Sequence, residues 1–129
     1  MSKFALKELT QVAKGPVKFF KLIENKRCPF DDFCTEIKRE GNLSGYLNAI
    51  YRIMDRVAKG EPLANGMVGS IKGGNKNEFE FRKEDLRVYF IRNSEGHIII
   101  SGGKKTNQKK DIEKFQNMHQ RFIDNQNGK

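Results

Sequence analysis

The residues of this chain that could best support chemistry are basic, and they gather between Arg82 and Lys110. Arg82 directly follows one short apolar segment and Arg87 lies within another, and four lysines with no acid follow between Gly96 and Lys110. Clustered guanidinium and ammonium groups suit a phosphate-bearing partner, because each of them can neutralise one phosphate charge. The sequence therefore favours binding of an anionic ligand over any familiar catalytic motif.

Arg87 lies within the apolar run from 86 to 91. In a strand, Arg87 would share one face with Tyr89 and Ile91, while its immediate neighbours would point to the other face. An arginine among apolar side chains needs an anionic partner to offset its desolvation. That partner could be a bound phosphate or, as a structural salt bridge, Glu80. We expect Arg87 to be partly exposed, so that its loss would affect folding less than function.

Glu78 and Glu80 are carboxylates close in sequence to these bases, and several roles are open to them. They alternate with phenylalanines, so in a strand they would share one face. A pair of carboxylates there could transfer protons or hold a metal ion. They could instead form the solvated face of an amphipathic strand, or pair with Arg82 and Arg87 across a hairpin. We favour these last two roles, and expect no metal and no cofactor.

Other residues that could support chemistry give weaker patterns. His97 opens an apolar segment and His119 follows a methionine in a helical pattern, so we interpret both as structural. The glycine-rich segment 69–76 departs from a phosphate-binding loop in its residues, and the pattern that follows it is a strand and not a helix. Cys28 and Cys34 are too few for a zinc site, and we expect buried thiols in a reducing compartment.

Composition limits the class of protein. The chain has 129 residues, a formal net charge of +9 and a pI of about 9.7. We expect one domain over 1–129. The positive charge is spread along the chain, which favours a nucleic acid or an acidic protein as partner, although a basic domain that binds nothing anionic stays possible. We expect a cytoplasmic protein with no membrane partner, because no apolar run approaches the roughly 20 residues that span a bilayer.

The elements that must position these residues follow from hydrophobic periodicity. The pattern predicts an α+β domain with a largely antiparallel sheet of four to five strands, helices covering one face, and a C-terminal helix. The expected helices cover 2–14, 29–40, 44–59 and the segment after 106, where Thr106 or Asn107 would be the N-cap. The expected strands cover 17–23, 67–72, 79–81, 86–91 and 97–100, with hairpin turns at 83–85 and 93–96.

Several of these segments together resemble the RelE/HigB toxins of the RelE/ParE superfamily, and more narrowly the HigB-like, phage-derived (Gp49-like) branch. The resemblance covers about 17–122. The first 15 residues lie outside it, as an extra N-terminal helix. The segments that carry it, in order, are the strand and helix over 19–33, Phe79-Glu80-Phe81-Arg82, Leu86-Arg87-Val88-Tyr89-Phe90 and Gly103-Lys104-Lys105-Thr106.

The resemblance implies a RelE-like fold and the toxin of a type II toxin–antitoxin system. Such a toxin would be a ribosome-dependent mRNA endonuclease that works without metal, bound by a cognate antitoxin that is a helix-turn-helix or acidic protein. The 2′-hydroxyl of the RNA would attack the adjacent phosphate. The protein would then help to remove a proton, neutralise the phosphate and protonate the leaving oxygen, in part through a lysine of lowered pKa.

The resemblance also assigns residues by position. Arg87 matches the strand arginine that stabilises the phosphate. Lys105 matches a basic residue after the last strand, and Arg82 matches one at the end of the preceding strand, so these three are the expected catalytic residues. The expected RNA-binding residues are Lys72, Lys76, Lys104, Lys109 and Lys110.

The chain also departs from the family pattern. Glu78 and Glu80 stand where many members have lysines, and no tyrosine follows Lys105. Asp111 falls near the place of the C-terminal Tyr or His that many members use. The alternative is therefore a non-catalytic protein of the same fold that binds nucleic acid or a protein target such as gyrase.

Overall fold

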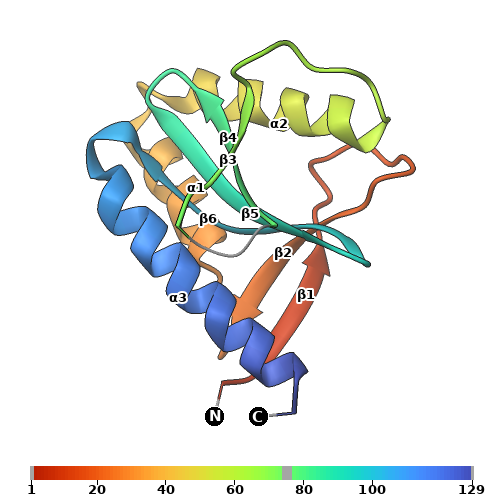
Figure 1. The fold of residues 1–129 in the computed structure, drawn as a ribbon. Coiled ribbons are helices and arrows are strands. Elements are labelled where there is room, and N and C mark those ends of the chain that lie inside the picture. The colour runs from red at the N-terminus through yellow and green to blue at the C-terminus, as the bar shows by residue number, and fades with distance from the viewer. Residues whose placement is uncertain (1, 74–76, 129) are drawn as a thin grey trace.

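The computed structural model describes residues 2–73 and 77–128, and in that part of the chain it shows an α+β fold with a six-stranded, mostly antiparallel sheet and three helices (Figure 1). In chain order the elements are β1 (Phe4–Glu8), β2 (Phe19–Glu24), α1 (Pro29–Glu40), α2 (Ser44–Ala58), β3 (Val68–Ser70), β4 (Glu78–Lys83), β5 (Leu86–Asn93), β6 (Gly96–Lys104), a 3-10 turn (Lys105–Asn107) and α3 (Gln108–Gln126).

The strands lie in the order β1-β2-β6-β5-β4-β3. Strands β4, β5 and β6 form a meander of antiparallel hairpins, as the sequence predicts for this region. Strand β2 pairs with β6 in parallel, from Phe19 opposite His97 to Lys21 opposite Ile99. The parallel pairing is possible because α1 and α2 carry the chain back between β2 and the meander. The sheet exceeds the expected four to five strands because β1 adds a strand at the edge beside β2, where a helix was expected.

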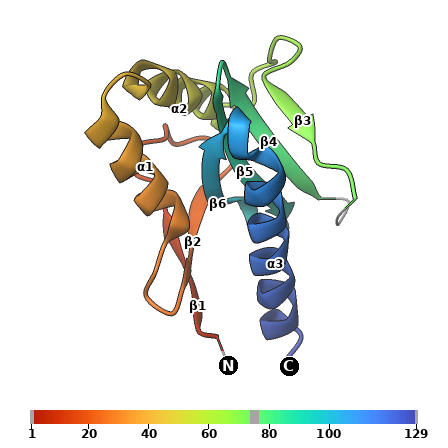
Figure 2. The same ribbon diagram turned by 90° about the vertical axis from the view of Figure 1, so that its left-hand side faces the viewer.

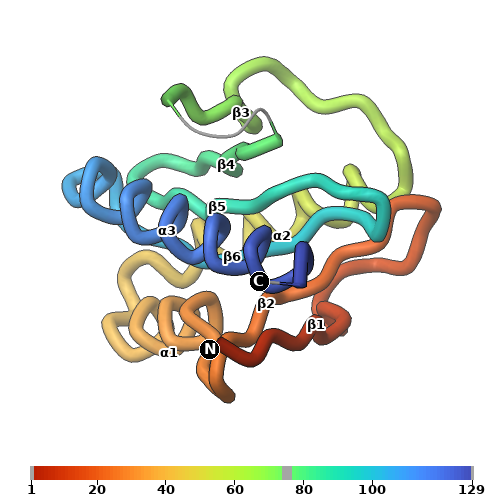
Figure 3. The backbone as a smooth tube through the Cα atoms, turned by 60° about the horizontal axis from the view of Figure 1, so that its bottom comes forward, coloured from red at the N-terminus to blue at the C-terminus, as the bar shows by residue number. Residues whose placement is uncertain are grey.

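Helices α1 and α2 pack together on one face of the sheet, as predicted, but α3 covers the other face, so the helices are not confined to one face. Figures 2 and 3 show α1 and α2 on one side of the sheet and α3 on the other. Strand β5 shows the consequence: Leu86, Val88 and Phe90 join the core under α1 and α2, whereas Tyr89 and Ile91 join the core under α3. A strand buried on both faces reads as a nearly continuous apolar run, whereas alternation indicates one covered face, so the run over 86–91 was itself the sign of two covered faces.

Residues 2–14 do not form the expected helix. Strand β1 runs antiparallel to β2, with Phe4 opposite Glu24, and Leu9 is buried beyond its end. A short segment has little helical stability of its own, and the free edge of β2 offers it a full set of backbone hydrogen bonds. The strand predicted over 67–72 is present as β3, but it is shorter and covers only Val68–Ser70. Among the described residues, no helix is long and apolar enough to cross a membrane.

Local signals set the ends of the elements that the sequence predicts correctly. Helix α1 begins at Pro29 and has acids in its first turn, which suits the helix dipole. It ends before Gly41, whose φ of 85° requires glycine and whose N–H donates to the Ile37 carbonyl. The N-cap of α3 is Asn107, but its side chain makes no capping hydrogen bond. The β4–β5 hairpin turns at Glu84, where φ is 50°.

Candidate nucleic-acid interface

The fold brings four of the predicted basic residues to one end of the sheet. Arg82 of β4 lies opposite Arg87 of β5, and Lys104 of β6 lies opposite the neighbouring Leu86. The N–H of Lys105 donates to the carbonyl of Asp85 in the hairpin turn, at 2.7 Å. The β4–β5 turn and the exit of β6 thus gather this set, which we call the basic cluster (Arg82, Arg87, Lys104 and Lys105).

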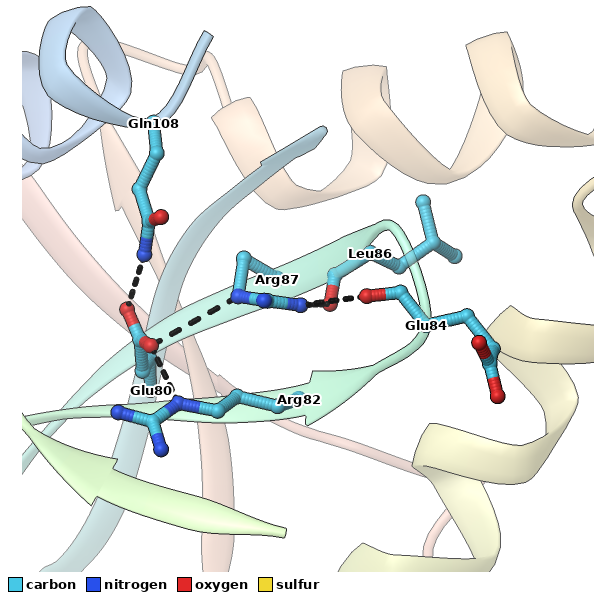
Figure 4. A network of polar contacts seen from close by, with 6 residues as sticks. All are labelled: Glu80, Arg82, Glu84, Leu86, Arg87 and Gln108. Carbon is cyan, nitrogen blue, oxygen red and sulfur yellow. Dashed lines mark hydrogen bonds and ion pairs between the residues drawn. The ribbon is translucent and has the colours of Figure 1, made fainter. Parts of the chain in front are cut away.

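Arg87 is buried at the centre of the basic cluster, with 9% of its surface exposed. Its Nη1 donates to the carbonyls of Glu84 and Leu86, at 2.7 and 2.8 Å (Figure 4). Its Nε makes no hydrogen bond with the described residues and lies 3.7 Å from Glu80 Oε2. The guanidinium group therefore ties the hairpin turn together, which contradicts the expectation of a partly exposed arginine whose loss the fold would tolerate.

Glu80 holds the basic cluster together from the α3 side. Its Oε2 accepts a 2.6 Å hydrogen bond from Arg82 Nε, and its Oε1 accepts one of 2.9 Å from Gln108 at the start of α3 (Figure 4). The salt bridge considered as the alternative for Arg87 is present, but Arg82 makes the shorter contact. Glu80 is only 4% exposed, so the solvated-face interpretation is wrong, because α3 covers this face.

Glu78 and the two histidines are packed against other side chains of the fold. Glu78 and His119 are each 1% exposed, and Nδ1 of the histidine lies 2.5 Å from the carboxylate. His97 packs between the rings of Phe19 and Phe90. Burial, with a smaller contribution from a nearby arginine, lowers the pKa of His97 to about 4. Both histidines therefore pack within the fold, as their sequence positions indicate, and Glu78 is buried where a solvated face was expected.

Two buried hydroxyls next to Arg87 were missed by the sequence analysis. Tyr89 Oη and Ser101 Oγ lie on directly opposed residues of β5 and β6, and neither makes a hydrogen bond with the described residues. Burial raises the pKa of Tyr89, and the carboxylates of Glu80 and Asp111 raise it further. Tyr89 could have been predicted to lie near Arg87, because it is two residues further along the same strand. The place of Ser101 opposite Tyr89 could not be predicted, because a β-bulge at Tyr89/Phe90 shifts the register of β6.

Asp111 of α3 lies over β6 beside the basic cluster. Gly103 is the residue opposite Arg87, and any side chain at Gly103 would collide with the Asp111 carboxylate. Burial, with a smaller effect of Glu36, raises the pKa of Asp111 although Lys114 opposes the shift. The carboxylate lines an 800 Å³ groove between α1, β6 and α3. A carboxyl group with a raised pKa in a groove is a candidate for proton transfer.

The predicted lysines divide into three groups. Lys104 is bound to Glu40 of α1 through contacts of 2.6 and 2.8 Å, and this hydrogen bond raises its pKa, which contradicts a lowered pKa for Lys104. The exposed lysines Lys105, Lys109 and Lys110 stand at and after the end of β6 without an ion pair to the described residues. Lys72 is exposed beyond β3, at the Glu78 end of β4, about 17 Å from the hairpin. Lys76 lies outside the described residues.

Comparison with known proteins assigns no role to the residues of this site. No protein-family model, no curated protein and no solved structure matches this chain. Within residues 2–73 and 77–128, no three His, Cys, Asp or Glu side chains are placed to hold a metal ion. Cys28 and Cys34 are buried free thiols, as expected, and burial raises the pKa of each.

Proposed function

We propose that this chain is a RelE/HigB-like toxin that cleaves mRNA on the ribosome without a metal ion, and that it acts in the cytoplasm with a cognate antitoxin. The proposal is supported by the positions of the three residues assigned by resemblance. Arg87 is on a central strand, Arg82 is near the end of the strand beside it, and Lys105 follows the last strand. Their meeting at one end of the sheet is the observation that carries the proposal.

Each member of the basic cluster has a role in this reaction. When the 2′-hydroxyl attacks, the phosphate gains negative charge, and preorganised cations aimed at that charge lower the barrier. Arg87 is fixed by the two turn carbonyls, and its buried Nε lies 3.7 Å from Glu80 Oε2, so in this proposal a phosphate displaces Glu80 before this N–H donates to it. Lys105 supplies an exposed charge beside it. Lys104, bound to Glu40, acts as a charge and not as a proton shuttle.

Asp111 is the group best placed to move the proton in this proposal. Its carboxylate lies over Gly103, the residue opposite Arg87, and forms no hydrogen bond with the described residues. A carboxyl group of raised pKa can accept the proton of the 2′-hydroxyl and return it to the leaving 5′ oxygen. This assignment agrees with the place of Asp111 near the family's C-terminal catalytic residue.

Induced expression in a bacterial host tests the proposal. Growth should stop, and mapping of mRNA 5′ ends should show new ends within translated codons. The matched control is Arg92→Ala, which removes an exposed arginine five residues further along β5. Arg92→Ala should remain toxic, whereas Arg87→Ala should not. Growth arrest without new 5′ ends would contradict the endonuclease assignment.

The alternative is a non-catalytic protein of the same fold that binds nucleic acid or a protein such as gyrase. It is favoured by the ion pairs of Glu80, because a phosphate must compete with this carboxylate for Arg82 and Arg87. Under this alternative, expression would stop growth and change DNA supercoiling or bind RNA, with mRNA left intact. A neighbouring open reading frame for a helix-turn-helix or acidic protein would support an antitoxin under either function.

A further inference from the structure

A second hollow lies at the hairpin end of the sheet. The α2 residues that line it were not among the functional residues predicted from the sequence. The hollow has a volume of about 620 Å³ and lies between α2, the loop before β3 and the β4–β5 hairpin. Apolar side chains contribute to its wall, together with five basic residues and one acid. The apolar residues are Ala49, Ile53 and Met67; the charged ones are Arg52, Arg56, Arg82, Lys83, Glu84 and Arg87.

Helix α2 turns one face to this hollow. Ala49, Arg52, Ile53 and Arg56 follow the spacing that places residues on one side of a helix. Ile53 is buried in the core, while Arg52 is exposed and makes no hydrogen bond or ion pair with the described residues. Arg56 is held in place, because its Nη2 donates to the carbonyl of Pro62 at 2.8 Å. The helix therefore presents one free and one fixed arginine beside an apolar wall.

This hollow also reaches the basic cluster. Arg87 lines it, although Glu80 and Gln108 cover the cluster from the α3 side. The guanidinium group of Arg87 points toward the hairpin turn at Glu84, which lines the same hollow (Figure 4). An anion that enters beside α2 can therefore approach Arg87 without displacing the first turn of α3.

We propose that this hollow binds one unstacked nucleotide of a single-stranded RNA, with its phosphate held by Arg52 and Arg87 and its base against Ala49, Ile53 and Met67. The proposal rests on the proposed function in taking RNA as the ligand. A free phosphate would leave the apolar wall uncovered, and a duplex would keep its bases out of reach. The volume falls within the range of sites for small ligands, and the aliphatic side chains of Ala49, Ile53 and Met67 offer a base an apolar surface without a base-specific hydrogen bond.

The first test compares two exposed arginines that have no side-chain partner among the described residues. Arg52→Gln removes one from the hollow, and Arg39→Gln removes one from the last turn of α1. The probe is a fluorescein-labelled decauridylate, titrated with the purified protein at several salt concentrations. Arg52→Gln should weaken binding about tenfold and lower the salt slope by about one, the effect of losing a phosphate contact. Equal losses in the two variants would overturn the proposal.

The second test fills the hollow without removing a charge from it. Ala49→Glu places a carboxylate against the wall, and Asn48→Glu adds the same charge at the exposed neighbouring position outside it. Ala49→Glu should reduce decauridylate binding at least tenfold beyond Asn48→Glu, with thermal melts of both variants confirming the fold. If the two variants bind alike, the nucleotide does not occupy this hollow.

These measurements separate the two proposals because they need neither a ribosome nor cleavage. Loss of decauridylate binding in Arg52→Gln and Ala49→Glu, with no cleavage by the unchanged protein, would retain the nucleotide site and reject the endonuclease. Cleavage of mRNA with equal binding by the Arg52 and Arg39 variants would retain the endonuclease and reject this site.

Discussion

At the residue scale, the side chains of the basic cluster that we propose to act on RNA also stabilise the fold through their own charged contacts. Arg87 binds two turn carbonyls, and Glu80 binds Arg82, Arg87 and Gln108. Burial makes each of these contacts stronger than it would be in water and makes an unpaired partner costly. Substitutions here must therefore be measured for both folding and activity.

The first prediction concerns Arg87→Ala. Cleavage should fall about a hundredfold or more, the scale for loss of one preorganised donor. The free energy of unfolding should also fall, by about 2–4 kcal/mol, because the turn carbonyls and Glu80 lose a buried charged partner. Denaturant unfolding and 5′-end mapping on the same preparation measure both effects. Full toxicity of a folded Arg87→Ala protein would show that Arg87 is not catalytic.

The second prediction concerns Glu80→Gln. This variant removes the carboxylate that competes with phosphate for Arg82 and Arg87, so affinity for decauridylate should rise about three- to tenfold. The melting temperature should fall, because the two arginines lose their buried counter-charge. Asp85→Asn, in the exposed turn beside them, removes an equal charge without breaking this network. If affinity does not exceed that of Asp85→Asn, Glu80 does not restrain the arginines.

The third prediction concerns Asp111→Asn. It should abolish the rise of cleavage rate with pH that a carboxylate base gives. Because the pKa of Asp111 is raised on folding, its ionisation opposes folding as pH rises from its ordinary value of 3.8 through the higher folded value. Asp111→Asn should therefore be at least as stable as the unchanged protein at pH 7, and this advantage should vanish near pH 3. Equal pH–rate profiles would exclude the proton-transfer role.

At the element scale, the β2–β6 pair joins the N-terminal part of the chain to the meander. Their parallel pairing spans only three registered pairs, and the rings of Phe19, Phe90 and His97 pack at this junction. Beyond Ile99, α1 and α3 lie on opposite faces of β6 (Figure 3), with Gly102 against Phe33 and Gly103 against Asp111. The two glycines permit this close approach, since a side chain at either would collide with a helix.

The fourth prediction concerns His97. Its pKa falls to about 4 on folding, so the neutral ring stabilises the fold above its ordinary pKa of 6.5, and this contribution is lost as pH falls toward 4. The melting temperature should therefore decline between pH 6.5 and 4, and the decline should be smaller in His97→Phe, which keeps an aromatic ring. Thermal melts across this range, with His119→Gln as a second histidine variant, measure the difference. An identical decline in His97→Phe would exclude His97 as its source.

At the scale of the whole molecule, the net charge of +9 adds a long-range attraction to any polyanion. The free lysines Lys105, Lys109 and Lys110 extend this charge from the basic cluster onto the start of α3. Lys72 stands at the other end of β4, so it belongs to the general positive surface and not to the cluster.

The fifth prediction follows from this charge. Affinity of the protein for decauridylate should fall linearly with the logarithm of salt concentration, because each neutralised phosphate releases counterions. The combined variant Lys105→Gln, Lys109→Gln and Lys110→Gln should have a smaller slope, while Lys72→Gln should change it less. Binding titrations between low and moderate salt measure the slopes. An affinity that does not change with salt would remove the electrostatic basis of RNA binding.

The sequence by itself determined the local elements that carry the site. The acids and glycine around α1, the apolar runs of β5 and β6 and the turn residues between them act over a few neighbouring residues, so these elements could be predicted. The alternation around Arg87 also placed it correctly on the face of Tyr89 and Ile91. Contacts within one element depend on spacing along the chain, which the sequence states directly.

Only the tertiary structure decided the surroundings of those residues. Packing of α3 on the sheet buries Glu80. Pairing with the edge of β2 makes residues 4–8 a strand, where the sequence pattern predicted a helix. The same long-range packing placed Asp111 over Gly103 and brought Arg52 and Arg87 into the wall of one hollow. Such contacts join residues far apart in the chain, and their free energy depends on which elements pack against one another. Local sequence patterns do not show which elements will pack together.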